Sequence, residues 1–147
     1  MIDDDDPPER QVPMDELQQL VAENEIRNLV ARYAHLIDDA QVQEWSELFA
    51  EDGRMHAFGM PLEGRAALSE WVTGVLAGPK LRHVMGGTHV VVDSATEAHG
   101  SADMVLLAAN EGAWVVAAAP RYVDKYVKTA EGWRFAERIL EDRSAAS

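Results

Sequence analysis

The stretch RAALSEWVTGVLAGPKLRHVMGGTHVVVD, residues 65 to 93, changes its hydrophobic period at Pro79. Before Pro79, apolar residues recur at three- and four-residue steps, which predicts a helix that ends at Gly78 and Pro79. After Pro79, the residues are β-branched or alternate between apolar and polar, which predicts a strand. The period change therefore divides the chain into a helical first half and a stranded second half.

Three more segments after residue 93 have the character of strands, and turn residues such as those at 93–94 and 131–132 separate them. They are AHGSADMVLLAAN, WVVAAAPRYVDKYVKT and WRFAERILE. Four consecutive strands joined by short links pair most simply in an antiparallel sheet. In WVVAAAPRYVDKYVKT, Tyr122, Asp124 and Tyr126 share one face, a polar and aromatic set that suits a pocket wall or a subunit contact better than plain core.

The helical half begins with apolar residues from Leu17 to Ile37 at helical spacing, which predicts an amphipathic helix from about Asp15 to Asp38. A second, short helix is expected over VQEWSELFAEDG, ending at Gly53, followed by a short strand RMHAFG. Gly86 and Gly87 predict a bulge that bends the first long strand. The expected fold is α+β, with about three helices and a cone-shaped, curved mixed or antiparallel sheet wrapped around the long N-terminal helix.

Composition limits the classes of function. The formal net charge is −13 and cysteine is absent, so thiolate metal sites, disulfides and cysteine nucleophiles are excluded. We expect residues 1–12 to be a disordered acidic tail, residues 13–143 a single domain and residues 144–147 a short tail. The acidic surface argues against nucleic acid and membranes as partners, and no signal sequence is recognisable, so a cytoplasmic protein is expected.

Two histidines stand on the first long strand. His83 and His89 are six residues apart, about 20 Å on a regular strand, and a bulge between them would turn them to opposite faces. A shared metal ion is therefore not expected. His89 fits a sheet or interface position, and His99 fits a surface position near a strand end.

Asp38 ends the predicted first helix, where a carboxylate faces the negative end of the helix dipole. A functional role would explain this placement, and a simple solvent-exposed helix end is the alternative. Asp39, the next residue, could take the same role.

The segments RYAHLIDDAQVQEWSELFAEDGRM, LRHVMGGTHVVVD and YVDKYVKTAEGWRFAER together resemble the SnoaL-like family of the nuclear transport factor two-like superfamily. The similarity covers about residues 15–141. The patterns in that family that are most similar are those of scytalone dehydratase, bile acid 7α-dehydratase and hexachlorocyclohexane dehydrochlorinase. The resemblance implies a His–Asp dyad of His83 and Asp38, with Tyr33 and Arg138 in the substrate pocket. His56 and Trp71 are further candidates for substrate binding.

In such a dyad a neutral imidazole takes a proton while the carboxylate fixes its tautomer. The resemblance implies a lyase that eliminates water or a hydrogen halide, in which Tyr33 or Arg138 would help the leaving group depart, and an isomerase would use the same pair. The sequence has no glycine-rich phosphate loop, metal cluster or cysteine, so no cofactor is expected. The expected substrate is a small, largely apolar and neutral cyclic molecule. The alternative is a non-catalytic module that binds a small ligand or another subunit. Apolar runs such as VVV and MVLLAA indicate that the open sheet face is covered, so we expect a homodimer or homotrimer.

Overall fold

A computed structural model of the chain describes residues 13–144. In that part the order of elements is α1 (Glu16–Asp38), α2 (Val42–Ser46), β1 (Phe49–Ala57), β2 (Met60–Glu63), α3 (Arg65–Leu76), β3 (Leu81–Val92), β4 (Glu97–Asn110), β5 (Ala113–Ala118), β6 (Arg121–Thr129) and β7 (Gly132–Glu141). The predicted acidic tail, 1–12, and residues 145–147 of the predicted C-terminal tail lie outside the described residues.

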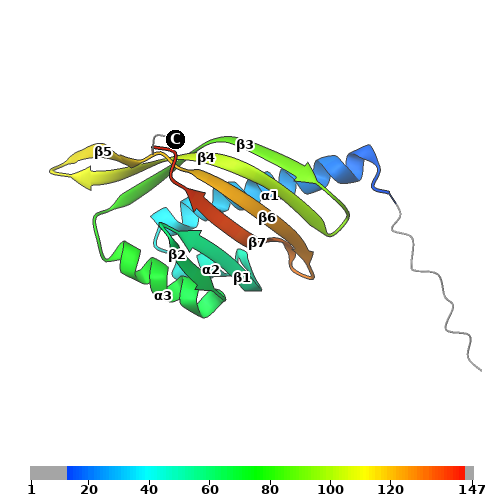
Figure 1. The fold of residues 1–147 in the computed structure, drawn as a ribbon, viewed down its shortest axis with the longest axis horizontal. Coiled ribbons are helices and arrows are strands. Elements are labelled where there is room, and N and C mark those ends of the chain that lie inside the picture. The colour runs from blue at the N-terminus through cyan, green and yellow to red at the C-terminus, as the bar shows by residue number, and fades with distance from the viewer. Residues whose placement is uncertain (1–12, 145–147) are drawn as a thin grey trace, which may run out of the picture.

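The sheet is curved and mixed, and its strand order is β2-β1-β7-β6-β4-β3, with β5 paired to β4. Strands β1 and β7 are parallel and the other neighbours are antiparallel. Helix α1 crosses one face of this sheet, and α2 and α3 lie near β1 and β2 (Figure 1). The prediction of an α+β fold, with about three helices and a curved mixed sheet packed on a long N-terminal helix, is confirmed.

Helix α1 begins where the sequence predicts. Asp15 is the N-cap and accepts a hydrogen bond from the backbone of Gln18, whose side chain bonds back to the N-cap backbone. The buried stripe runs from Ala22 to Ile37. The first apolar residues of the predicted stripe, Leu17, Leu20 and Val21, are instead exposed. Figure 1 shows that the N-terminal turns of α1 extend beyond the strands.

The second helix is shorter than predicted. It stops at Ser46, and the chain enters β1 at Phe49, so the expected continuation to Gly53 is wrong. Pairing with β7 decides the local structure, since the Phe135 N–H donates to the Leu48 carbonyl at 2.9 Å. Gly53 lies in a register shift of β1, where an added Cβ would stand 2.8 Å from the Ala50 carbonyl oxygen.

The single strand predicted over WVVAAAPRYVDKYVKT is in fact two strands. The break falls at Ala119 and Pro120, between β5 and β6, because proline has no N–H to donate to a ladder. Strand β4 pairs with β6 along residues 97–103 and with β5 along residues 106–110. Strand β2 was also not predicted. Strands β4 and β5 form a hairpin that extends beyond the body of the domain (Figure 1).

The predicted bulge in β3 is confirmed, because the pairing of β3 with β4 shifts between Met85 and Thr88. Before the shift Leu81, His83 and Met85 are the more buried residues, and after it Thr88 and Val90 are. The bulge thus changes which side chains of β3 point inward.

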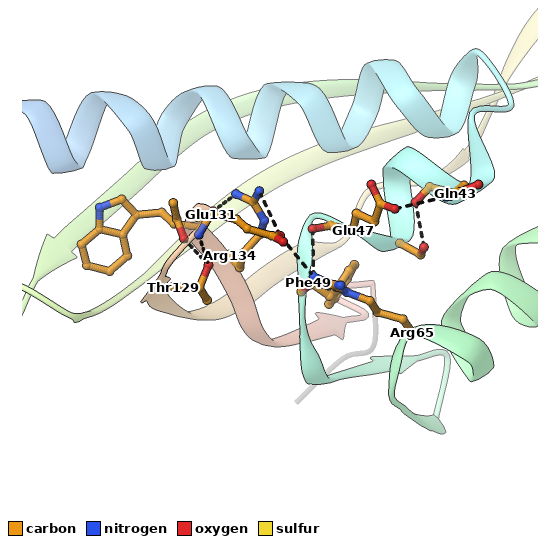
Figure 2. A network of polar contacts seen from close by, with 10 residues as sticks. Gln43, Glu47, Phe49, Arg65, Thr129, Glu131 and Arg134 are labelled. Atoms are coloured by element: carbon orange, nitrogen blue, oxygen red, sulfur yellow. Dashed lines mark hydrogen bonds and ion pairs between the residues drawn. The ribbon is translucent and has the colours of Figure 1, made fainter.

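Helix α3 is attached to the sheet through its first residue. The Arg65 guanidinium donates to the Phe49 carbonyl oxygen at 3.0 Å from Nε and at 2.8 Å from Nη2. The Glu131 carboxylate, in the β6–β7 turn, lies 4.0 Å from Arg65 and 3.9 Å from Arg134, and Figure 2 shows this network. No helix of the described residues is long and apolar enough to cross a membrane.

Candidate active site

The carboxylate of Asp38 and the imidazole of His83 lie in direct contact. Asp38 Oδ1 is 2.7 Å from His83 Nδ1. The backbone N–H of His83 also donates to the same carboxylate, at 2.9 Å to Oδ2 and 3.1 Å to Oδ1. Asp38 is the last residue of α1 and His83 the third of β3, so this carboxylate links the end of the helix to the strand at the edge of the sheet.

This contact sets the tautomer of His83. An ionised Asp38 accepts the proton on Nδ1, which leaves Nε2 as the unprotonated nitrogen. Nε2 has no hydrogen-bond partner in residues 13–144, and this atom is not fully buried. Nε2 therefore retains contact with accessible space, although the side chain of His83 is only 6% exposed.

The surroundings of His83 favour its neutral form. Burial lowers the pKa of His83 below its ordinary value of 6.5, and the nearby Arg138 charge lowers it further. The hydrogen bond and the charge of Asp38 raise this pKa but do not cancel the effect of burial. At neutral pH the imidazole is thus free to accept a proton.

Tyr33 and Arg138 lie behind His83, in the core. Tyr33 meets the His83 ring edge-on at 6.4 Å between centroids, and its hydroxyl lies 3.7 Å from the Met55 sulfur. Arg138 is fully buried, and its guanidinium carbon lies 4.3 Å from the centre of the Tyr33 ring. The structure thus places both residues near His83 but inside the packed core.

Arg138 is held by a buried carboxylate. Its Nε and Nη2 donate to the two oxygens of Asp124 at 2.9 Å and 3.2 Å, and Asp124 also accepts from the Tyr126 hydroxyl at 2.9 Å. Arg138 Nη1 has no partner among the described residues. The Tyr122 ring packs at 3.7 Å from the guanidinium carbon, so a cation–π contact completes the cluster.

Tyr122 was not singled out as a site residue, although the polar and aromatic face that contains it was recognised. Its ring packs against the Tyr33 ring at 5.5 Å. Burial raises the pKa values of Tyr33 and Tyr122, so both phenols stay protonated. Alternation in β6 predicts that Tyr122 and Asp124 share a face, but only the sheet order brings them beside Arg138 of β7.

An open hollow of about 480 Å³ adjoins the dyad. Its helix wall is formed by residues of α1, its strand wall by residues of β3 and the residue before it, and Trp114 of β5 closes one side. The lining residues include Ala31, Ala34, His35, Asp38, Asp39, Lys80, Arg82, His83 and Trp114. The volume is within the range of small-molecule sites.

The other predicted site residues lie away from this hollow. Trp71 of α3 packs on Trp45 at 6.3 Å between rings, and His56 is exposed on β1 between β2 and β7. Neither lines the hollow. Asp39 is the C-cap of α1 and lines the hollow, but the contact with His83 is made by Asp38.

His89 and His99 occupy outer positions. His89 is exposed and follows the bulge, so it faces away from His83. His99 is exposed and forms its own contact with Asp93, at 2.8 Å. Residues 13–144 contain no group of three acidic or histidine side chains that could hold a metal ion.

The sequence also matches the model of a known family. The family model of the SnoaL-like domain matches residues 18–139. The chain belongs to the SnoaL-like domain family. No curated protein has a sequence that matches this chain.

Solved structures share the fold of this SnoaL-like domain. One is a protein of unknown function from Mycobacterium tuberculosis, with 26% identity and a TM-score of 0.85 over 90% of this chain and 79% of that chain. Another is an NTF2-like protein with a cystatin-like fold from Novosphingobium aromaticivorans, with 26% identity and a TM-score of 0.82 over 89% of this chain and 88% of that one.

A third similar structure, from the same organism, is a candidate scytalone dehydratase. It has 20% identity and a TM-score of 0.77, and the match covers 88% of this chain and 98% of that chain. At this level of identity the similarity shows the fold alone.

Proposed function

We propose that this SnoaL-like domain is a lyase of the dehydratase or dehydrohalogenase type, or an isomerase, that needs no cofactor. Its substrate is a small, largely apolar cyclic molecule. The observation that carries the proposal is the contact of 2.7 Å between Asp38 Oδ1 and His83 Nδ1, with His83 Nε2 left unpaired beside an open hollow. This is the arrangement of a general base and the carboxylate that orients it.

In the proposed elimination, His83 Nε2 takes a proton from a substrate carbon. The electron pair of that C–H bond forms the new double bond, and the leaving group departs with its own bonding pair. The imidazolium that forms is stabilised by Asp38, 2.7 Å from Nδ1. In the isomerase variant the imidazolium returns the proton to another carbon of the same molecule.

Tyr33 and Arg138 are the proposed donors to the leaving group. Tyr33 is supported by its raised pKa, which keeps its phenol protonated, and Arg138 by its unpaired Nη1. Both are fully buried and neither lines the hollow. A substrate that uses either donor must therefore reach past His83 into the aromatic core.

The competing function is a module that binds a ligand or another subunit without chemistry. It is favoured by two observations: the hollow is open, and aromatic side chains fill the space behind His83. The fold is also shared with the β subunit of a candidate aromatic-ring-hydroxylating dioxygenase from Novosphingobium aromaticivorans, at 20% identity and a TM-score of 0.71 over 89% of this chain and 94% of that chain.

The test is a screen of steroid, polyketide and terpenoid fragments by thermal shift, followed by a turnover assay on each ligand found. Loss of the base in His83→Ala is expected to lower turnover by about a hundredfold or more. His89→Ala is the matched control, because it removes an exposed histidine from the outer face of the same strand. Equal turnover by wild type, His83→Ala and Asp38→Asn would refute the dyad, and binding without turnover would favour the module.

A further inference from the structure

The hollow beside His83 is lined by two cations that have no acidic partner within residues 13–144. The chain has 26 acidic residues against 13 lysines and arginines. Nine lysine and arginine side chains in residues 13–144 accordingly lie within 4.0 Å of a carboxylate. Three others in that range, Arg32, Lys80 and Arg82, form no such ion pair with a described carboxylate. Lys80 and Arg82 line the hollow. In so acidic a protein, two unpaired cations at one site call for an explanation.

The hollow has walls of opposite charge. Lys80 immediately precedes β3 and Arg82 is its second residue. Both line the hollow from the strand side, at the more exposed positions that alternate with Leu81 and His83. The acidic groups Asp38 and Asp39 lie on the helix wall, and Asp38 is already bonded to His83. The position of Lys80 is fixed, because its carbonyl oxygen accepts the Ala109 N–H at 2.9 Å.

The hollow also has a flat aromatic side. Trp114 is 45% exposed and lies on the β4–β5 hairpin, where it pairs with Ala109. The helix wall includes Ala31 and Ala34, whose small side chains leave space in the hollow. An indole next to small side chains suits a planar ring, which stacks on an aromatic surface.

From these features we infer that the ligand of this site is a planar ring compound with one acidic group, a carboxylate or a phenolate, held by Lys80 and Arg82. Lys80 is three residues from His83, about 10 Å along a strand, which is the span of a small bicyclic molecule. The inference rests on the site of the proposed function and names its substrate class.

This inference changes the sequence-based expectation of a neutral ligand. The net charge of −13 repels anions at long range. At physiological ionic strength, however, charges are screened beyond about 8 Å, so nearby groups decide binding within the hollow. Two unpaired cations in direct contact with a carboxylate form charge-assisted hydrogen bonds, which are about twice as strong as neutral ones.

The test compares 2-naphthoate with 2-naphthamide, two probes of nearly equal shape that differ in charge. Calorimetric titration of the full chain is expected to show naphthoate binding at least about tenfold more tightly, a difference of about 1.4 kcal/mol. The double variant Lys80→Ala/Arg82→Ala should lose this preference. Arg32→Ala, which removes the unpaired cation outside the hollow, is the matched control and should keep it.

Three results would overturn the inference. They are equal affinity for the two probes, no binding of naphthoate at millimolar concentration, and an equal loss of preference in Arg32→Ala. The aromatic side is tested by tryptophan fluorescence, since naphthoate should quench wild type more strongly than Trp114→Phe. An equal quench in the two proteins would refute stacking on Trp114.

The outcome is separable from that of the proposed function. His83→Gln should keep the preference for naphthoate, because the acidic group is held by Lys80 and Arg82. Charge-selective binding without any turnover would support the inference and contradict the dyad. Turnover of neutral ring compounds alone would support the dyad and contradict the inference of an acidic ligand.

Discussion

The carboxylate of Asp38 accepts both the ring Nδ1–H and the backbone N–H of His83. The strand that carries His83 lies at the edge of the sheet, where its outer backbone groups have no neighbouring strand. Asp38 therefore fixes the histidine ring and also satisfies a backbone donor at this edge. One side chain thus has a proposed catalytic role and an evident structural one.

The structural role predicts a loss of stability in Asp38→Ala. The His83 backbone N–H is half-buried and would lose its acceptor, which costs about 1–3 kcal/mol. Urea unfolding followed by circular dichroism measures this loss. Asp39→Ala is the control, because its side chain makes no contact with His83, and it should change the unfolding free energy little. Equal losses in the two variants would show that Asp38 has no special role in holding β3.

The lowered pKa of His83 predicts a dependence of stability on pH. Burial favours neutral His83 in the folded state, so the unfolded state binds a proton first as the pH falls below 6.5. The free energy of unfolding should thus decrease as the pH falls from 6.5 through the lower, folded pKa. Between pH 7.5 and pH 6.5 it should change little through this group. His83→Gln should show a shallower decrease in parallel urea titrations, and identical slopes would exclude His83 as the source.

The buried pair of Arg138 and Asp124 predicts a large effect from one substitution. Asp124→Ala would leave the fully buried guanidinium without its acid, which costs about 3–5 kcal/mol. Chemical denaturation measures this cost. Asp103→Ala is the matched control, since it breaks the exposed pair with Arg121, at 2.7 Å, and should change stability little. Similar effects in both variants would contradict the importance of burial.

The outer face of the sheet predicts self-association into a homodimer or homotrimer. Val84 and Val105 lie directly opposite each other on β3 and β4 and are both exposed, and Val123 of β6 is exposed as well. Sedimentation or light scattering should show an oligomer for wild type and a monomer for Val84→Asp/Val105→Asp. Leu17→Asp, on the exposed start of α1, should remain oligomeric. A monomeric wild type would refute the prediction.

Local pattern accounts for the parts of the fold that depend on neighbouring residues. The start of α1 at Asp15, its end at Asp38 and the bulge at Gly86 and Gly87 follow from the sequence, since their signals lie within a few residues. The helix predicted to reach Gly53 was wrong because contact with β7, about 85 residues away, makes Phe49 part of a strand.

The site divides in the same way. The pair of His83 and Asp38 was predicted from a family resemblance, and it is present as a contact. The Tyr122 and Asp124 environment of Arg138 depends on which strands are neighbours, and alternation within one strand gives no information about that. The unpaired state of Lys80 and Arg82 within residues 13–144 depends on every acidic side chain around them, whereas composition alone favoured a neutral ligand.

The bulge at Gly86 and Gly87 lets the two ends of β3 present different faces to α1 within one continuous strand. The segment before it presents His83 to α1, whereas the segment after it presents His89 to the outside. Deleting one of these two glycines would shift the alternation of side chains on one side of the deletion by one residue. One of the two strand ends would then rotate its apolar side chains outward, and the other would keep its place. The pair of glycines is therefore a point at which the dyad and the outer sheet face can vary independently.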